Sequence, residues 1–167
     1  MAVAAAGKWR ETAMLVIDMQ VVREHDPCGR DVELFRRHLY VNGKGPTMKD
    51  SKGAELVEGL VPLEGEYKLV KTRFSAFFDT HLNSLLQSSG IKSLVVVGVQ
   101  TPNCIRQTVF DAVASNYQPV SVIVDATAAA NSEVHTDAFS FQTLVPDLKH
   151  SINAAFESPK APEKMEI

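Results

Sequence analysis

The hydrophobic positions of the chain fall into short continuous runs separated by amphipathic stretches. Leu94–Val99 and Val120–Val124 are rich in β-branched residues, and continuous apolar runs of this length are typical of strands buried on both faces of a parallel sheet. The apolar residues between these runs recur at helical spacing: Ile105, Val109, Ala112 and Val113. We therefore expect a helix from about Asn103, so that residues 93–125 form a strand–turn–helix–strand unit.

The same patterns predict elements on both sides of this unit. Strands are expected at Ala13–Asp18 and Glu66–Lys71. One helix is expected at Phe78–Gln87, ended by Gly90, and another from Ser132 onward. Strands alternate with helices from Glu66, which favours an α/β fold with a parallel sheet. In such sheets, ligands bind outside the carboxyl ends of the strands.

The segment between the first two predicted strands is polar and rich in glycine and proline. Two short helices are candidates within it, Val32–His38 and Ala54–Leu60. In the first helix, Arg36, Arg37 and His38 are expected to face solvent. A long irregular segment in a compact domain is usually functional or poorly ordered. Its first part, Arg23–Arg30, is therefore either a substrate-side loop or a solvated surface loop.

Composition narrows the class of protein. The 167 residues, 45% hydrophobic and 22% charged, are typical of one globular domain. A net charge of −3, with no basic stripe, gives no reason to expect nucleic acid. No apolar run approaches the about 20 residues of a membrane span. Two cysteines make no disulfide framework, and the N-terminus resembles no signal peptide, so we expect a cytoplasmic protein.

Cys104 is the first candidate for chemistry. The predicted turn places this thiol at a helix N-terminus, after Pro102 and the potential capping residue Asn103. The unpaired N–H groups and the dipole of a helix N-terminus favour a thiolate, which is the nucleophilic form. A free cysteine is also commonly a small buried hydrophobe, and this stretch alone does not decide between the two interpretations.

Asp18 and Lys71 are candidates because of where their strands end. By itself, Asp18 could cap a turn, and Lys71 could be an ordinary surface charge. Both residues nevertheless fall at the carboxyl end of a predicted strand, as the turn before Cys104 does. A parallel sheet would bring all three side chains to one crevice.

Three stretches around these residues resemble the isochorismatase-like cysteine hydrolases, which include nicotinamidases and related amidases. They are LVIDMQ around Asp18, KTRFSAFFDT after Lys71, and VVVGVQTPNCIRQTVFDAV around Cys104. Within the family, the chain looks most like the plant nicotinamidase-like branch. The resemblance implies a Rossmann-like three-layer α/β/α fold with a mainly parallel sheet. It also implies a catalytic triad, carried over as Asp18, Lys71 and Cys104.

The resemblance further implies a non-proline cis peptide just before the nucleophile, here at Val99–Gln100. Together with Thr101, this bond would shape the oxyanion site. The expected chemistry is attack of the Cys104 thiolate on a small carboxamide, with a thioester intermediate. Four residues are candidates to contact this substrate, although packing explains the last three equally well: Gln20, Arg73, Phe74 and Phe77.

The chain departs from the family pattern in two places. In members of the family, the first strand is usually followed by a loop, a long helix and a second strand. Here the segment that begins with Val21 joins Gln20 directly, two residues after Asp18. A parallel crossover needs about a dozen residues or more, so we expect the sheet to lack one strand and a helix. From near Ala138 the sequence matches no family pattern. We expect an incomplete hydrolase domain at 1–157 and a disordered tail at 158–167.

No metal or other cofactor is expected. Nicotinamidases resemble one another in an Asp-x-His motif that binds a metal, and the chain has no such motif. Its five histidines are scattered and are expected to face solvent for the most part.

The leading hypothesis is therefore a metal-free hydrolase of a small amide. An alternative is a catalytically inactive relative, or a shortened isoform that acts as an interaction partner. A weaker alternative makes Cys104 a redox-sensing thiol. The oligomeric state stays open, although relatives in this family often form homo-oligomers, and an uncovered sheet edge favours self-association.

Overall fold

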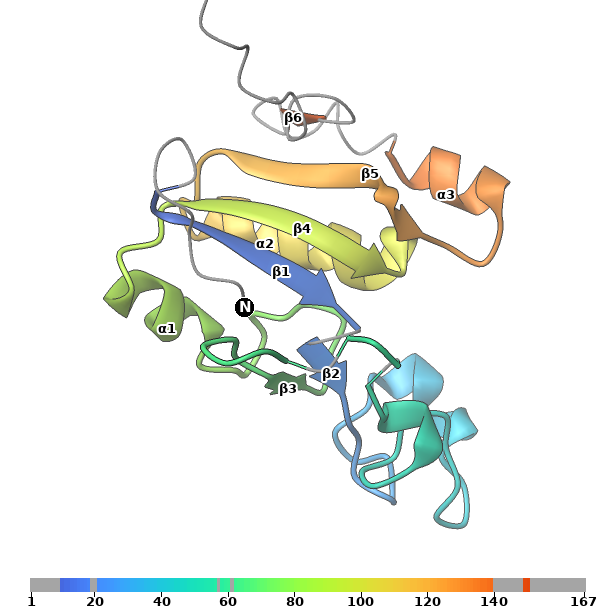
Figure 1. Ribbon diagram of the computed structural model, residues 1–167. Helices are drawn as coiled ribbons and strands as arrows, with labels where there is room; N and C mark the ends of the chain where they lie inside the picture. Colours follow the sequence, from blue (N-terminus) through green and yellow to red (C-terminus); the bar gives the residue numbers. More distant parts are fainter. Residues whose placement is uncertain (1–9, 19–20, 57, 61, 140–148, 151–167) are drawn as a thin grey trace, which may run out of the picture.

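A parallel β-sheet forms the centre of the computed structural model, in which structure is described for residues 10–18, 21–56, 58–60, 62–139 and 149–150. Its six strands are ordered β3-β2-β1-β4-β5-β6 (Figure 1). They are β1 (Thr12–Ile17), β2 (Val21–Arg23), β3 (Leu69–Lys71), β4 (Ser93–Val99), β5 (Val120–Ala128) and β6 (Lys149–His150). Every neighbouring pair is parallel, so the predicted α/β class with a parallel sheet is confirmed.

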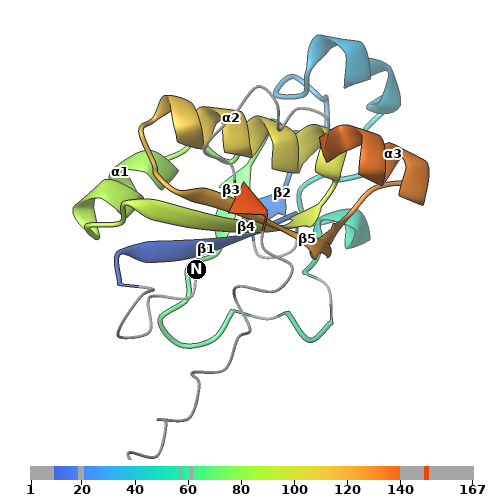
Figure 2. The same cartoon turned by 90° about the horizontal axis from the view of Figure 1, so that it is seen from above.

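The α-helices of the described residues lie on one side of this sheet. They are α1 (Leu82–Ser88), α2 (Arg106–Ala114) and α3 (Ser132–Ala138), and Figure 2 shows all three above the strands. Leu82 and Leu86 of α1 and Val109 of α2 pack with Leu94 and Val96 of β4 in one buried cluster. Removal of these apolar side chains from water is the main force that holds the layers together. Among the described residues, no α-helix covers the other face, where Met14 of β1 is exposed.

β2 is a strand that the sequence did not predict. Only three residues separate Ile17 from Val21, yet Val21–Arg23 is a strand parallel to β1. The two strands share a single register pair, Ile17 with Val21, whereas β2 pairs with β3 along its whole length. No crossover is needed, because the chain continues in the same direction and β2 begins where β1 ends. Among the described strands, residues 12–16 of β1 are paired only on the β4 side, and Ile17 is paired on both sides.

Gly98 allows β4 to approach the end of β1 closely. A Cβ atom at this position would lie 2.1 Å from the carbonyl oxygen of Ile17, and the φ of Gly98 is +109°. Both the contact and the backbone angle favour glycine. The pairing of β4 with β5 also shifts register between Val96 and Gly98. This close approach places the end of β4 beside the end of β1, where Asp18 follows.

The predicted helix at Phe78–Gln87 begins later than expected. α1 starts at Leu82, and the Phe78 side chain is 53% exposed rather than part of the core. The reason lies in the turn before it. Asp79 has a φ of +52°, and the hydroxyl of Thr80 accepts a hydrogen bond from the backbone N–H of Leu82. This local turn keeps residues 79 and 80 out of the helix, whose N-cap residue is His81.

The segment between β2 and β3 holds two short 3₁₀ helices, η1 (Leu34–Leu39) and η2 (Lys52–Ala54). They replace the predicted helices Val32–His38 and Ala54–Leu60. Figure 1 shows this segment, in light blue and teal, beyond the carboxyl end of β1.

The expected tail, 158–167, and the last residues of the expected domain, 151–157, lie outside the described residues. A search of the described part of the chain found no helix that is long and apolar enough to span a membrane.

Candidate active site

An ion pair joins the ends of two strands. Asp18 follows β1 with a φ of +54°, and Lys71 is the last residue of β3. The Nζ atom of Lys71 lies 2.8 Å from Oδ1 of Asp18, and the lysine side chain is fully buried, whereas the aspartate side chain is 18% exposed. The pair therefore places an anchored carboxylate at the surface of the crevice.

Two backbone carbonyls complete the surroundings of the lysine. Nζ donates to the carbonyl oxygen of Arg73 at 2.9 Å and to that of Phe74 at 3.1 Å. An ammonium has three donors and no acceptor, and together with Asp18 three oxygens surround it. This arrangement satisfies a buried charge that would otherwise be costly, and it fixes the position of the Asp18 carboxylate.

Cys104 lies in the first turn of the helical segment that follows β4. This segment begins with a π-helical turn, η3 (Thr101–Ile105), and continues as α2. The predicted start at Asn103 is therefore wrong by two residues. Gln100, in extended conformation, occupies the cap position, with Pro102 within the first turn, and the Asn103 amide donates to the Gln100 side chain at 3.4 Å.

Of the residues predicted for the oxyanion site, two line the cavity and the third contacts α3. The peptide bond between Val99 and Gln100 is cis, at the position expected from the sequence, and both residues line the cavity described below. Thr101 is buried beside them, and its hydroxyl forms a hydrogen bond of 2.8 Å with Nδ1 of His135. This contact joins α3 to the turn that carries Cys104, and no sequence pattern indicated it.

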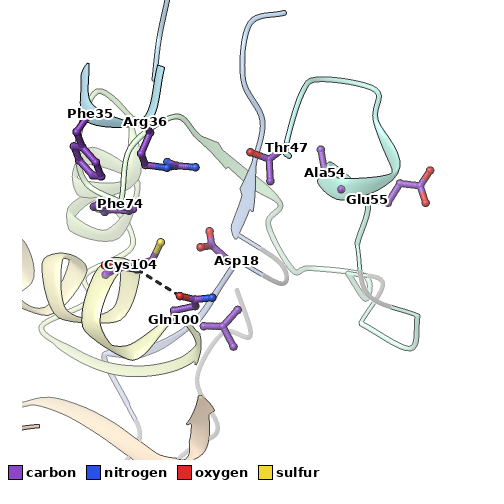
Figure 3. A pocket seen from close by; sticks show the side chains of 12 residues that line it. Asp18, Phe35, Arg36, Thr47, Ala54, Glu55, Phe74, Gln100 and Cys104 are labelled. Carbon is purple, nitrogen blue, oxygen red and sulfur yellow. Dashed lines mark hydrogen bonds between the residues drawn. The ribbon is translucent and has the colours of Figure 1, made fainter. Parts of the chain in front are cut away.

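A cavity of about 390 Å³ brings Asp18 and Cys104 together. Figure 3 shows the sulfur of Cys104 and the carboxylate of Asp18 directed into the same space. A volume of this size is in the range of small-molecule sites. The remaining wall comes from Phe74, from the turn after β4, and from the segment between β2 and β3.

Arg23–Arg30, the part of that segment considered as a substrate-side loop, does not line the cavity, and the residues that do were not predicted. The segment supplies Phe35, Arg36, Thr47, Gly53, Ala54 and Glu55 to the cavity. Arg36, expected to face solvent, instead has a side chain that is only 14% exposed. The signal that could have found this wall was the length of the irregular segment, since it follows a strand whose carboxyl end meets the crevice.

The four predicted substrate-contacting residues have different fates. Phe74 lines the cavity. Phe77 is not among the residues that line it, because its ring packs against the core and lies 5.8 Å from that of Tyr117. Arg73 also lies outside the lining, with its guanidinium 5.7 Å from the centre of the Phe78 ring. Gln20 lies outside the described residues.

Among the described residues, no group of three or more histidine, cysteine, aspartate or glutamate side chains is arranged to hold a metal ion. His25 is an exception to the expectation that most histidines face solvent: it is buried, and its Nδ1 lies 3.4 Å from Oδ1 of Asp31. Neither Cys28 nor Cys104, both described, is in a disulfide.

The chain resembles proteins of known family in sequence and in structure. A model of the isochorismatase domain matches residues 2–145. A protein of Arabidopsis thaliana described as a probable inactive nicotinamidase is 53% identical over 171 residues, which cover 78% of this chain and 87% of that protein.

Solved structures give the same picture. An isochorismatase family protein from Desulfovibrio vulgaris has a TM-score of 0.72 at 41% identity, over 77% of this chain and 67% of that chain. N-carbamoylsarcosine amidase from Thermoplasma acidophilum has a TM-score of 0.65 at 26% identity, over 88% of this chain and 75% of that chain.

Proposed function

Since the chain belongs to the isochorismatase family, a family that includes amide hydrolases, we propose that it is a cysteine-dependent hydrolase of a small carboxamide. Asp18, Lys71 and Cys104 are its catalytic residues in this proposal. One observation carries it: an Asp18 carboxylate that Lys71 holds at 2.8 Å faces the cavity that Cys104 also lines.

The first half of the reaction forms a thioester. The Asp18 carboxylate accepts the proton of the Cys104 thiol, and the thiolate attacks the carbonyl carbon of the amide. When the tetrahedral intermediate collapses, the C–N bond breaks and Asp18 returns the proton to the departing nitrogen. The products of this half are the acylated Cys104 and ammonia or an amine.

The second half releases the acid. Asp18 accepts a proton from a water molecule, whose oxygen attacks the thioester carbonyl. The C–S bond breaks, and the proton returns to the sulfur, so that the enzyme is restored and no redox partner is needed. Lys71 keeps Asp18 charged and oriented through both halves, because an adjacent cation favours the carboxylate form.

The negative charge that develops on the substrate oxygen needs donors. In this proposal, backbone N–H groups of Gln100, Thr101 and Cys104 receive it, since these residues lie at the start of the helical segment, where Gln100 and Cys104 line the cavity. Backbone donors at the start of a helical segment suit an oxyanion because they are already oriented toward it.

Amide substrates are consistent with the relatives. The structural relative from Thermoplasma acidophilum is an amidase, and an amide C–N bond is the bond that the proposed chemistry cleaves. The name of the Arabidopsis thaliana relative supports a second candidate function, a protein of the same fold without catalysis. The short connection between Asp18 and β2 favours this alternative, because a displacement of about 1 Å in a catalytic group can cost about 100-fold in rate.

Alkylation by iodoacetamide separates the two candidates. The chain contains its own reference thiol, because Cys28 is exposed and lies outside the cavity. We expect Cys104 to be alkylated at pH values well below 8.5, the approximate pKa of an ordinary thiol, and the exposed Cys28 is labelled under the same conditions for comparison. Mass spectrometry of the two peptides across pH measures both rates in one sample.

Asp18→Asn is expected to remove the low-pH reactivity of Cys104 and to leave that of Cys28 unchanged. Cys104→Ala identifies the labelled peptide. If Cys104 reacts no faster than Cys28 at any pH, the hydrolase is rejected in favour of the inactive relative. If Cys104 reacts at low pH, small amides are then screened for the release of ammonia.

A further inference from the structure

Arg36 lines the cavity that holds Asp18 and Cys104, and the proposed reaction gives it no role. It lies on η1, in the wall contributed by the segment between β2 and β3. Figure 3 shows its guanidinium extending across the cavity, on the side toward which the Asp18 carboxylate and the Cys104 sulfur point. Arg36 is the only cationic residue among the described residues that line this space.

The contacts of Arg36 hold its head group and leave most of its donors available. Nη1 donates to Oε2 of Glu33 at 2.8 Å, and both side chains are 14% exposed. The guanidinium also lies over the ring of Phe74, 5.5 Å from its centre. A guanidinium has five N–H donors, and only one of them is matched by an acceptor in the described part of the chain.

A guanidinium in this setting is suited to a carboxylate. Its planar fork binds the two oxygens of a carboxylate in a bidentate manner, and partial exclusion of water strengthens the contact. The other cation of the site, Lys71, is already surrounded by Asp18 and two carbonyl oxygens. An anionic group of a ligand in this cavity would therefore turn to Arg36.

The charges around the cavity set the number of charges on that ligand. Glu33 neutralises part of the charge of Arg36, and Asp18 adds a negative charge to the wall. Glu55 also lines the cavity, but Figure 3 shows its carboxylate at the far end, directed away from Arg36. A single negative charge is compatible with this balance, whereas a dianion such as a phosphate would meet more repulsion.

We propose that the substrate is a small amide that also carries a carboxylate, and that Arg36 binds this carboxylate while the amide lies at Cys104. Phe74, which lies under the guanidinium, would contact the carbon chain between the two groups. This inference rests on the proposed hydrolase function for the identity of the reacting group. The binding of the carboxylate, however, requires no catalysis and is tested without it.

The test compares ligands that differ only in charge. The monoamides of succinic and glutaric acid carry one amide and one carboxylate, whereas the corresponding diamides are neutral and nearly equal in size. Titration calorimetry with the Cys104→Ala protein measures their dissociation constants while excluding turnover. Charge-assisted hydrogen bonds to arginine predict that at least one monoamide binds about tenfold or more tightly than its diamide.

Variants then locate the contact. Arg36→Gln should remove the preference for the monoamide, and Arg37→Gln is the matched control, since Arg37 is the next residue on η1, is exposed and does not line the cavity. Arg36→Lys, which keeps the charge and loses the fork, should retain an intermediate preference. Circular dichroism confirms that each variant is folded. If Arg36→Gln does not fold, the Arg36→Lys protein and the unsubstituted Arg36 protein still decide the question.

Three results would overturn the inference: equal affinities for every monoamide and diamide pair, no measurable binding of any monoamide, or a preference that survives in Arg36→Gln. Failure of the proposed function has a different signature. In that case iodoacetamide does not alkylate Cys104 at low pH, while the Cys104→Ala protein still binds a monoamide more tightly than its diamide.

Discussion

Lys71 Nζ lies 2.8 Å from Asp18 Oδ1, although the strands that precede the two residues are not neighbours. β2 separates β1 from β3 in the sheet and is only three residues long. The lysine side chain therefore reaches past a short strand to the aspartate, and the buried ion pair connects both sides of that strand.

Loss of the Lys71 charge should destabilise the fold and lower the reactivity of Cys104. Lys71→Met leaves the Asp18 carboxylate without its cation, and such a change costs about 2 kcal/mol or more of unfolding free energy. The expected loss is smaller than for a fully buried ion pair because the Asp18 side chain is partly exposed to water. Urea unfolding measures the change.

Lys68→Met provides the matched control, since Lys68 is exposed and lies 3.6 Å from Glu24. A surface pair of this kind contributes less than about 1 kcal/mol. Equal effects of the two substitutions would contradict a structural role for the Asp18–Lys71 pair.

Gly98→Ala should disturb the junction of β1 and β4. The added methyl group would lie 2.1 Å from the Ile17 carbonyl oxygen at a φ of +109°, so the two strands must separate. We expect a loss of about 3 kcal/mol in unfolding free energy. Gly90→Ala is the comparison, because Gly90 has a φ of +68° and open space around it, and about 1–2 kcal/mol is expected there. A smaller effect at Gly98 than at Gly90 would argue against the close approach.

Removal of the Thr101 hydroxyl should loosen the contact between α3 and the turn that carries Cys104. Thr101→Val keeps the shape of the side chain and leaves Nδ1 of His135 without its partner, for an expected cost of about 1–2 kcal/mol. Thr101→Ser should retain most of the stability. Thermal unfolding followed by circular dichroism measures the stability, which should decrease from the wild type to Thr101→Ser to Thr101→Val. A Thr101→Val protein as stable as the wild type would contradict the role of this hydrogen bond.

Tyr117 should make the protein sensitive to alkaline pH. Burial raises the pKa of this phenol above its ordinary value of 10.0. Because the folded-state pKa is the higher one, the stabilising contribution is complete below about pH 10 and is lost as the pH rises through the folded-state pKa. Urea midpoints measured from pH 9 to 11.5 should therefore fall less steeply for Tyr117→Phe than for the wild type. Equal slopes for Tyr117→Phe and the wild type would contradict a contribution from Tyr117.

The strands and the chemical centre were predictable because their signals are local. Leu94–Val99 is apolar at every position, and such a run is typical of a strand buried on both faces of a parallel sheet. Once two such strands are parallel, the residues that follow them, Asp18 and Cys104, must meet at one edge. Lys71 follows by the same logic, although its position in the sequence does not reveal that it is buried.

What could not be predicted depends on contacts between distant parts of the chain. The burial of Arg36 results from a segment with no periodic pattern that folds back over the crevice. β2 was not predicted because parallel neighbours normally need a crossover of about a dozen residues, and β2 pairs with β1 without one. The start of α1 depends on the positive φ of Asp79 and the Thr80 hydroxyl, whereas the apolar stripe around Phe78 indicates helix and nothing about its first residue.

The small separation of β1 and β2 in the sequence connects Asp18 closely with the segment that forms much of the cavity wall. Two residues of sequence lie between Asp18 and Val21, and the segment that carries Arg36 continues from β2. Asp18 and Arg36, which both line the cavity, therefore belong to stretches of chain on the two sides of β2. A change in the position of β2 would alter the cavity lining at both residues.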